Sequence, residues 1–388
     1  MSTERLYHVD PYIRSFQASL VRTTDDRQTV YLDQSAFYPA SGGQDADLGW
    51  IDGIPVVDVR DEGEWVAHRL ERPLGDTGQI RGELDWRRRY DNMQQHTGQH
   101  LLSAVIESLF GYPTVSVHMG DQISTIELGA PQFSDEQAAN SEARCGELIA
   151  ASLPVRISFE DASAATGLRK ASERTGQLRI IEIAGVDRSA CGGTHVKSTA
   201  ELSLVQIRRR EKVRNNIRLE FVSGTRALDR VRQDFRIVAE LSRACTVAID
   251  DLPATVASLR QRLTDAEKDR QKVGLELARR QGADLFAACS PGAEGIRRTL
   301  LTPATLTEEA RATAQAFAER GRAIALILAA DAPSVLVAAA ADSGVHAGNL
   351  LKQILAGHGG KGGGSATVAQ GSLAGAEGRR ELQTALGF

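Results

Sequence analysis

Two histidines lie four residues apart in the stretch "QQHTGQHLL", residues 94–102. The apolar spacing of this stretch predicts a helix, which would place His96 and His100 one turn apart on the same face. A helix presents two imidazoles to one metal ion in this way. Thr97 stands where the zinc-metalloprotease pattern requires a glutamate, so the motif does not indicate a metalloprotease. Two imidazoles alone do not complete a zinc site, and the other ligands must come from elsewhere in the chain.

A second pair lies in "CGGTH", residues 191–195. Cys191 and His195 are also four residues apart, but the glycines between them favour a tight turn over a helix. With the helical pair they make a tetrahedral nitrogen and sulfur set that suits zinc. Either all four side chains bind the ion, as in a structural site, or water replaces one of them, as in a catalytic site. His68 has no paired neighbour, and we interpret it as an ordinary histidine.

The stretch "SAFYPASGGQDADLG", residues 35–49, is the next candidate for function. The pair Gly42-Gly43 permits a close backbone approach that a Cβ atom would block. Ser35 and Gln44 supply neutral hydrogen-bonding groups beside it. A plain loop between two strands accounts for the same residues, so the stretch indicates function only in combination with the metal motifs.

Composition limits the class of protein. The 388 residues are long enough for two or three domains, and four widely spaced cysteines fit a reducing compartment better than a disulfide framework. A net charge of −4 gives no bulk reason to expect nucleic-acid binding, so any such contact must come from local patches. The chain has no 18-residue apolar run and starts without a signal peptide. We therefore expect a cytoplasmic protein without a membrane segment.

The patterns change three times along the chain and predict an α+β protein. Alternating apolar residues predict a small β-barrel over residues 1–86, and mixed helix and strand patterns follow over residues 87–225, with a helix at about 90–110. Residues 226–282 are glycine-poor, and their apolar residues follow a 4-3 spacing that Arg270 interrupts. This segment is either a helical or coiled-coil arm or an amphipathic helix packed on its own domain.

Residues 283–388 read as a compact α/β domain. Two buried strands are predicted at "AIALILAA" and "SVLVAAA", and a short helix is predicted at "NLLKQILAG". The helix runs into "GHGGKGGG", residues 357–364, which we interpret as a glycine loop. The loop is not a P-loop, because Lys361 is followed by Gly362 and not by serine or threonine.

Three of these stretches together resemble a known family. "FYPASGGQDADLG", "QHTGQHLL" and "RSACGGTHV" resemble the signatures of the editing domain of alanyl-tRNA synthetase, which free-standing alanyl-tRNA editing proteins share. The resemblance covers about residues 1–225. "NLLKQILAGHGGKGGGSATVAQG" resembles the C-terminal glycine-rich domain of the same synthetase. No amino-acid-activating domain precedes the barrel and no DHH-phosphoesterase motif is present, so we expect neither tRNA charging nor phosphoesterase activity.

The resemblance implies that the protein hydrolyses the ester joining serine or glycine to the 3′ adenosine of alanine tRNA. It assigns His96, His100, Cys191 and His195 to a zinc ion. Ser35 falls where the family commonly has a threonine that senses the serine hydroxyl, which leaves the preference between serine and glycine open. Gln44 is a candidate for holding the substrate or a water molecule. Asp187 is a candidate for orienting a ligand imidazole, although a plain turn residue would also fit.

Two runs concentrate positive charge, "RRREKVRNNIR" at 208–218 and "WRRRY" at 86–90. Arg208, Arg209 and Arg210 are candidates for contacts to tRNA phosphates, and Lys361 adds charge to the glycine loop. A solvated surface is the alternative for the basic runs. A homodimer through the helical arm or the C-terminal domain is a further possibility. Two other functions stay open: an RNA-binding protein with a structural zinc ion, and a zinc hydrolase of another aminoacyl ester.

Overall fold

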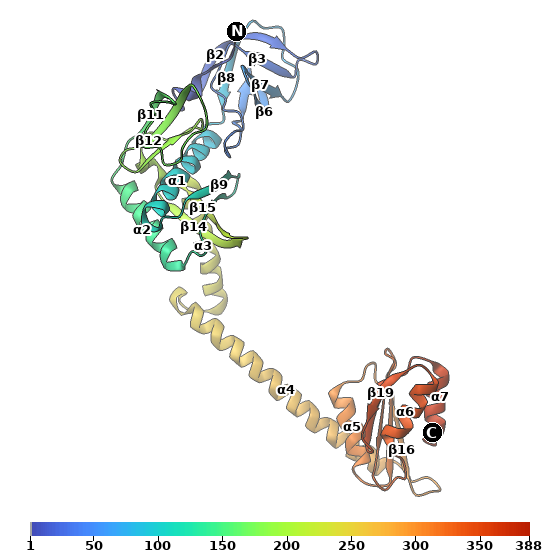
Figure 1. Cartoon of the computed structure of the whole chain (residues 1–388). Helices are drawn as coiled ribbons and strands as arrows, with labels where there is room; N and C mark the ends of the chain where they lie inside the picture. Colours follow the sequence, from blue (N-terminus) through green and yellow to red (C-terminus); the bar gives the residue numbers. More distant parts are fainter. Residues whose placement is uncertain (1) are drawn as a thin grey trace. The chain divides into compact units, whose positions relative to one another are not determined.

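The computed structural model describes residues 2–388 and confirms the predicted α+β class (Figure 1). The chain forms two compact units, one that ends at Leu241 and one that begins at Ser242. The finer division into four parts stays a prediction. No helix within residues 2–388 is both long and apolar enough to cross a membrane.

The first unit begins with a closed barrel of six antiparallel strands in the order β2-β3-β7-β6-β5-β8. Side chains alternate between the barrel core and the solvent, as the sequence pattern requires. The short strands β1 (Glu4–Arg5) and β4 (Gln34–Ser35) pair in parallel beside it, and a 3-10 turn covers Leu6–His8. The barrel strands are β2 (Ser15–Thr23), β3 (Thr29–Leu32), β5 (Gly49–Ile51), β6 (Ile54–Glu62), β7 (Trp65–Leu70) and β8 (Gln79–Leu84).

Helix α1 (Trp86–Phe110) follows the barrel and is the central element of the unit. The Asp85 side chain accepts a hydrogen bond from the Arg88 amide and so caps the N-terminus of the helix. The helix therefore begins at Trp86, four residues before the predicted start at about residue 90. Gly111 ends it in the left-handed conformation, at φ 69°, which matches the predicted end of the helix at about residue 110. Nearly every residue from Asn92 to Ile106 is buried, so α1 runs through the unit as a core helix.

Two sheets and two further helices complete the first unit. The larger sheet has the order β14-β15-β10-β9 and the smaller one the order β11-β12-β13. One hydrophobic core joins α1, α2 and both sheets. The strands are β9 (Thr114–Met119), β10 (Ser124–Leu128), β11 (Val155–Asp161), β12 (Gln177–Ile183), β13 (Asp187–Ala190), β14 (Val205–Val213) and β15 (Asn216–Ser223), and the helices are α2 (Asp135–Ala150), a 3-10 turn at Thr199–Leu202, and α3 (Gly224–Cys245).

The second unit begins with the last residues of α3, from Ser242, and continues through a 3-10 turn at Ile249–Asp251 into helix α4 (Leu252–Ala288). The segment predicted to be helical is therefore helical, and α4 extends six residues beyond the predicted end at 282. Its 4-3 apolar residues are exposed in this unit: Val256, Leu259, Leu263, Val273 and Leu277.

A five-stranded sheet with the order β16-β17-β18-β20-β19 forms the centre of the second unit. Helix α5 covers one face of the sheet, and α6 and α7 pack on the other. The two predicted strands and the short helix are confirmed as β17, β18 and α6. The bounds are β16 (Arg297–Leu301), α5 (Glu308–Ala318), β17 (Ala323–Leu328), β18 (Ser334–Ala339), α6 (Ala347–Gly357), β19 (Lys361–Gly364), β20 (Val368–Ser372) and α7 (Ala376–Ala385).

The prediction of a glycine loop over 357–364 is wrong for its second half. Residues 361–364 form the edge strand β19, which pairs with β20 in an antiparallel ladder. A Cβ atom at Gly362 or Gly364 would overlap the backbone of β20, so these glycines permit the close approach of the two strands. Glycine here serves strand pairing as well as loop formation.

Candidate metal centre

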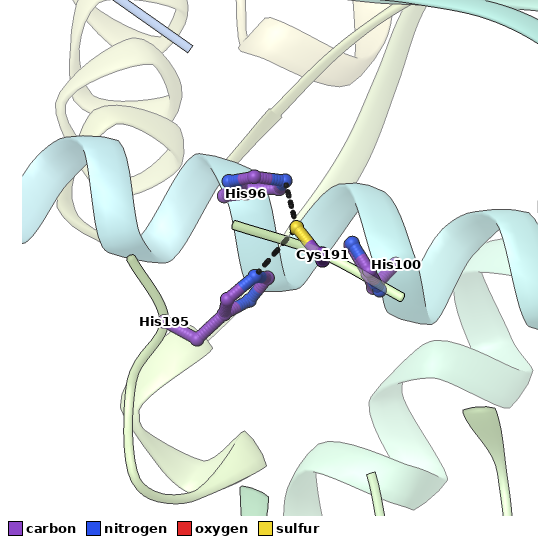
Figure 2. Close-up of side chains that lie close together, drawn as sticks. All are labelled: His96, His100, Cys191 and His195. Atoms are coloured by element: carbon purple, nitrogen blue, oxygen red, sulfur yellow. Dashed lines mark hydrogen bonds between the residues drawn. The ribbon is translucent and has the colours of Figure 1, made fainter. Parts of the chain in front are cut away.

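The four predicted ligand residues converge at one point (Figure 2). His96 and His100 come from α1, and Cys191 and His195 come from the turn that follows β13. Their ligand atoms all lie within 4.8 Å of one another. The Cys191 Sγ atom lies 3.3 Å from His96 Nε2 and 3.5 Å from His195 Nε2. The three histidines are buried and the cysteine is half-buried, so the cluster is largely shielded from solvent.

The turn that carries Cys191 and His195 has little space for other residues. A Cβ atom at Gly193 would overlap the His96 ring, whereas one at Gly192 would meet nothing within 4 Å. Arg179, on β12, donates from Nη1 to the carbonyl oxygens of Cys191 and Gly193, each at 2.8 Å. The second glycine and the buried guanidinium together fix the path of the turn beneath the helix.

Each ligand histidine has its Nδ1 atom against an oxygen of another side chain. The distances from Nδ1 to oxygen are 2.8 Å from His96 to Gln44, 2.7 Å from His100 to Asp187, and 3.1 Å from His195 to Thr97. An Nδ1–H that donates to oxygen leaves Nε2 as the free lone pair on the same ring. All three rings therefore point a basic Nε2 atom at one place, where the cysteine sulfur also lies.

Gln44 contacts the metal centre directly. Its Oε1 atom accepts from His96 Nδ1 and from the Thr194 amide at 3.1 Å, and its Nε2 atom donates to Thr194 Oγ1 at 2.9 Å. The sequence hypothesis placed this side chain against the substrate or a water molecule. The structure places it between a ligand ring and the ligand turn.

Ser35 lies within the barrel and not among the ligands. Its Oγ atom is 2.7 Å from His68 Nε2 and accepts a hydrogen bond from the Phe37 amide at 3.1 Å. Ser35 and His68 are both fully buried. Burial lowers the pKa of His68 to about 4, so the ring is neutral and Nε2 accepts the serine proton while Nδ1 faces the Val30 carbonyl.

Asp187 is not a member of the cluster but contacts its residue His100. It is buried and accepts hydrogen bonds from His100, from Arg169 Nε at 2.6 Å and from Ser189. Burial by itself raises the pKa of Asp187, but the hydrogen bonds and positive charges of His100 and Arg169 outweigh it and lower the pKa to about 2. Burial likewise lowers the pKa of His100, but Asp187 and Cys191 raise it to about 9.

The thiol of Cys191 is set for ionisation. Burial raises the pKa of Cys191, but the charge and hydrogen bonds of the neighbouring imidazoles outweigh it and hold the pKa well below its usual value. For His195, burial and the charge of His96 lower the pKa far below that of an exposed histidine. A thiolate and a neutral imidazole are the forms in which these side chains bind metal ions.

A buried ion pair ties the barrel to α1 and was missed by sequence reasoning. The Arg89 side chain is fully buried, and its Nε atom lies 3.0 Å from Asp47. The same guanidinium donates to the carbonyl oxygens of Pro11 and Ala36. Arg89 lies two turns before His96 on α1, so this pair anchors the loop of Gln44 against the helix that carries the ligands.

None of the predicted basic contacts belongs to the cluster found within residues 2–388. On β14, Arg208 pairs with Asp234 at 2.5 Å and Arg210 donates to the Phe133 carbonyl at 2.6 Å. Arg209 is exposed and only loosely paired, at 3.7 Å from Glu220. With Arg87 from the first turn of α1, Arg208 and Arg209 line a cleft of about 670 Å³. Lys361 is exposed at the start of β19, in the second unit.

The donor set fits a zinc ion. Three imidazole nitrogens and one thiolate sulfur are borderline-soft ligands in a number that fills a tetrahedral shell. No carboxylate belongs to the cluster within residues 2–388, and Mg²⁺ or Ca²⁺ would require oxygen ligands. A pocket of about 240 Å³ lies beside the cluster, with His195 in its wall.

Two segments of the chain match known domain families. Residues 178–219, which include Cys191 and His195, match the family "Threonyl and Alanyl tRNA synthetase second additional domain". Residues 305–387 match the DHHA1 domain family. The turn that carries Cys191 and His195 thus lies in a segment that matches a domain of threonyl- and alanyl-tRNA synthetases.

Full-length similarity defines the family. The chain is 31% identical to the alanyl-tRNA editing protein AlaX-L of Pyrococcus horikoshii, over 95% of this chain and 94% of the relative. It is 30% identical to the alanine–tRNA ligase of Pyrobaculum aerophilum, over 96% of this chain but 43% of that enzyme. The alanyl-tRNA editing protein Aarsd1 of Mus musculus is 34% identical over 64% of this chain and 61% of its own length. The chain belongs to the family of alanyl-tRNA editing proteins.

Proposed function

We propose that this chain hydrolyses the ester bond between serine or glycine and the 3′ adenosine of mischarged alanine tRNA. The observation that carries the proposal is the buried His/His/Cys/His cluster, beside a pocket, in a member of the editing family. An aminoacyl ester is an activated bond, so a positioned water molecule suffices as the nucleophile. The presence of a pocket favours this function over an RNA-binding protein with a purely structural zinc ion.

We further propose that the metal is zinc and that His96, His100, Cys191 and His195 hold it. A bound zinc ion supplies Lewis acidity, which polarises a carbonyl group or lowers the pKa of water. The protein's own part is to fix the ligands. Asp187, Gln44 and Thr97 hold the three imidazole rings in the tautomer that exposes Nε2, and Cys191 contributes a negative charge.

Selection of the substrate depends on which polar groups of the site the side chain of the bound amino acid leaves without a hydrogen bond. A missing methylene group, as in glycine, or an added hydroxyl group, as in serine, changes binding by only about 1–3 kcal/mol. Amino-acid activation therefore admits both errors, which a second, hydrolytic site has to remove. A site that hydrogen-bonds the serine hydroxyl would leave polar groups unsatisfied by alanine, which protects the correct product. We propose Ser35 for this role; its hydroxyl donates to His68 and accepts from the Phe37 amide, which leaves one lone pair on the oxygen without a partner. We propose that Gln44 acts on substrate binding indirectly, because it holds the turn that carries Cys191 and His195 in place.

We propose that the rest of the molecule recognises the RNA and assembles the protein. Arg208, Arg209 and Arg210 on β14, and Lys361 in the second unit, are proposed phosphate contacts. The exposed 4-3 apolar row of α4 is typical of a helix that pairs with a second helix, and it supports a homodimer. The cytoplasm is the proposed site of action, where tRNA is charged and cysteines stay reduced.

One assay tests the proposed function. Zinc-loaded protein is incubated with alanine tRNA charged with serine, glycine or alanine, and the release of each amino acid is followed. We expect release of serine or glycine, retention of alanine, and loss of activity together with zinc in the Cys191→Ala variant. RNA binding without release of any amino acid would contradict the proposal and favour the structural-zinc alternative.

A further inference from the structure

A row of aromatic and cationic side chains lies beside the pocket at the metal centre. The rings of Tyr12 and Trp86 have centroids 5.7 Å apart, and Trp86 stacks on Tyr90 at 5.6 Å with an interplanar angle of 28°. The Arg14 guanidinium carbon lies 4.2 Å from the Trp86 ring centroid, and the Lys197 Nζ atom lies 4.2 Å from the Tyr12 ring centroid. The row therefore consists of neighbouring aromatic rings with one cation over the ring of Trp86 and another over the ring of Tyr12.

Hydrogen bonds hold the aromatic part of this row rigidly. The Tyr12 and Tyr90 hydroxyls both donate to Glu201, at 2.7 Å and 2.9 Å, and the Lys197 amide donates to the Tyr12 hydroxyl at 2.9 Å. Three separate chain segments are thereby joined: the segment before β2, the first turns of α1, and the segment after His195. Packing against the core explains the aromatic residue types, but it does not explain the cations on their outer faces.

The two cations are free to meet a ligand. Arg14 is exposed, and no carboxylate within residues 2–388 lies within ion-pair distance of it. Lys197 is 65% exposed, and its carboxylate neighbour is Asp10 at 3.9 Å, a distance at the limit of an ion pair. Glu201, the other acid of the row, is already occupied by the two tyrosine hydroxyls.

The row starts at the metal centre itself. Lys197 follows the ligand His195 by two residues, and both line the 240 Å³ pocket. Its other lining residues are Val9, Asp10, Pro11, Val155, Ile157 and Val196. An extended ligand that lay along the row from Trp86 to Lys197 would thus reach the pocket that His195 lines.

We propose that this row binds the single-stranded 3′-terminal nucleotides of the RNA substrate and directs the 3′ end toward His195. The inference rests on the proposed function. Aromatic and guanidinium faces stack unpaired bases, and lysine and arginine neutralise the phosphates between them. A double-stranded stem would present no free base faces to the rings. An acidic peptide would pair with the two cations but would leave the aromatic faces without a matching ligand.

The test measures RNA binding alone. The probe is an uncharged, fluorescently labelled RNA hairpin with a four-nucleotide single-stranded 3′ extension, compared with the same hairpin without the extension. The full-length, zinc-loaded chain is expected to bind the extended hairpin more tightly. Arg14→Ala and Lys197→Ala are each expected to weaken binding of the extended hairpin by about threefold to tenfold and to leave binding of the blunt hairpin unchanged.

Salt dependence and matched variants complete the test. Each lost phosphate contact should reduce the slope of log affinity against log salt by about 0.7 for a single strand. Arg72→Ala removes another exposed arginine of the barrel region and should leave both affinities unchanged. Lys197→Arg should restore binding. Zinc content is measured in each variant, because Lys197 is close to His195 in the chain, and Arg14→Ala repeats the test at a position remote in sequence from the ligands.

Two results would overturn the inference: equal affinity of the full chain for the two hairpins, or an equal loss of affinity in Arg72→Ala and the two row variants. The assay does not depend on ester hydrolysis. A chain that binds the extended hairpin through this row but releases no amino acid would retain the inference and contradict the proposed function.

Discussion

A histidine binds a metal ion through either ring nitrogen, and in this centre three neighbouring side chains make that choice. Gln44, Asp187 and Thr97 each contact one Nδ1 atom, so the nitrogen that each ring would offer to a metal ion depends on residues outside the cluster. Gln44 contacts both halves of the cluster, because it also forms hydrogen bonds with Thr194 in the turn that carries Cys191 and His195.

Two substitutions at Gln44 separate these contacts. Gln44→Leu removes the acceptor for His96 Nδ1, and we expect zinc affinity to fall by about 10-fold to 100-fold. Gln44→Glu keeps an acceptor for that ring but loses donation to Thr194, so we expect a much smaller loss. Competition with a chelator gives both affinities. Equal affinities in the two variants would show that the contact with His96 does not govern the metal.

The pair of His100 and Asp187 predicts how zinc binding depends on pH. Because the pKa of His100 is raised to about 9, its ring holds a proton at pH 7 in the metal-free chain, and zinc must displace it. Competition by this proton is present below about pH 9 and disappears above it. Zinc affinity should therefore rise by about tenfold per pH unit between pH 7 and 9 and then level off.

A proton-release measurement and one variant check this pH dependence. Calorimetry in buffers of different ionisation enthalpy should show about one proton released per zinc ion at pH 7. In Asp187→Asn the pKa of His100 should fall, so the rise in affinity should move to lower pH, together with a weaker maximum affinity. A flat profile in the native chain from pH 7 to 9 would contradict the assignment.

At the scale of elements, the centre consists of helix α1 and the turn that carries Cys191 and His195. Gly193 permits the close approach of this turn to the helix. Gly193→Ala would place a methyl group on the His96 ring, whereas Gly192→Ala would place one in open space. We expect Gly193→Ala to lose most of its zinc on dialysis and its activity with it, while Gly192→Ala keeps both. Metal analysis and circular dichroism on the two proteins would show whether the fold survives. Full zinc occupancy in Gly193→Ala would contradict the prediction and show that the turn can shift to accommodate the methyl group.

The clustering of the four proposed ligand residues was predictable from sequence, because the spacing within each pair is local. His96 and His100 lie one helical turn apart, and a five-residue turn carries the other pair. Contacts between distant segments carry no such signal: Arg89 meets Asp47 from 42 residues away, and Arg179 bonds the ligand turn from a neighbouring strand. The strand β19 was missed for the same reason, because its glycines acquire a regular structure only by pairing with β20.

At the scale of the whole molecule, the chemistry and the remaining chain fall into different units. The metal centre, the barrel core and the core around α1 all lie in the unit that ends at Leu241. The second unit has its own cores on both faces of its sheet, and it carries the exposed row of α4 and Lys361. Each unit thus buries its own apolar residues, which indicates that the first can fold without the second.

A shortened chain of residues 1–241 tests this division of labour. It should keep its zinc and hydrolyse mischarged alanine tRNA at saturating RNA concentration, because all ligands and their supporting residues are present. Its affinity for tRNA should fall by about tenfold or more, since a second contact on the same RNA raises the effective concentration at the first.

Affinity and oligomeric state must be measured on the same sample. A weaker affinity at an unchanged oligomeric state assigns RNA contact to the second unit. Unchanged affinity with a shift from dimer to monomer would instead assign that unit, through the apolar row of α4, to assembly alone.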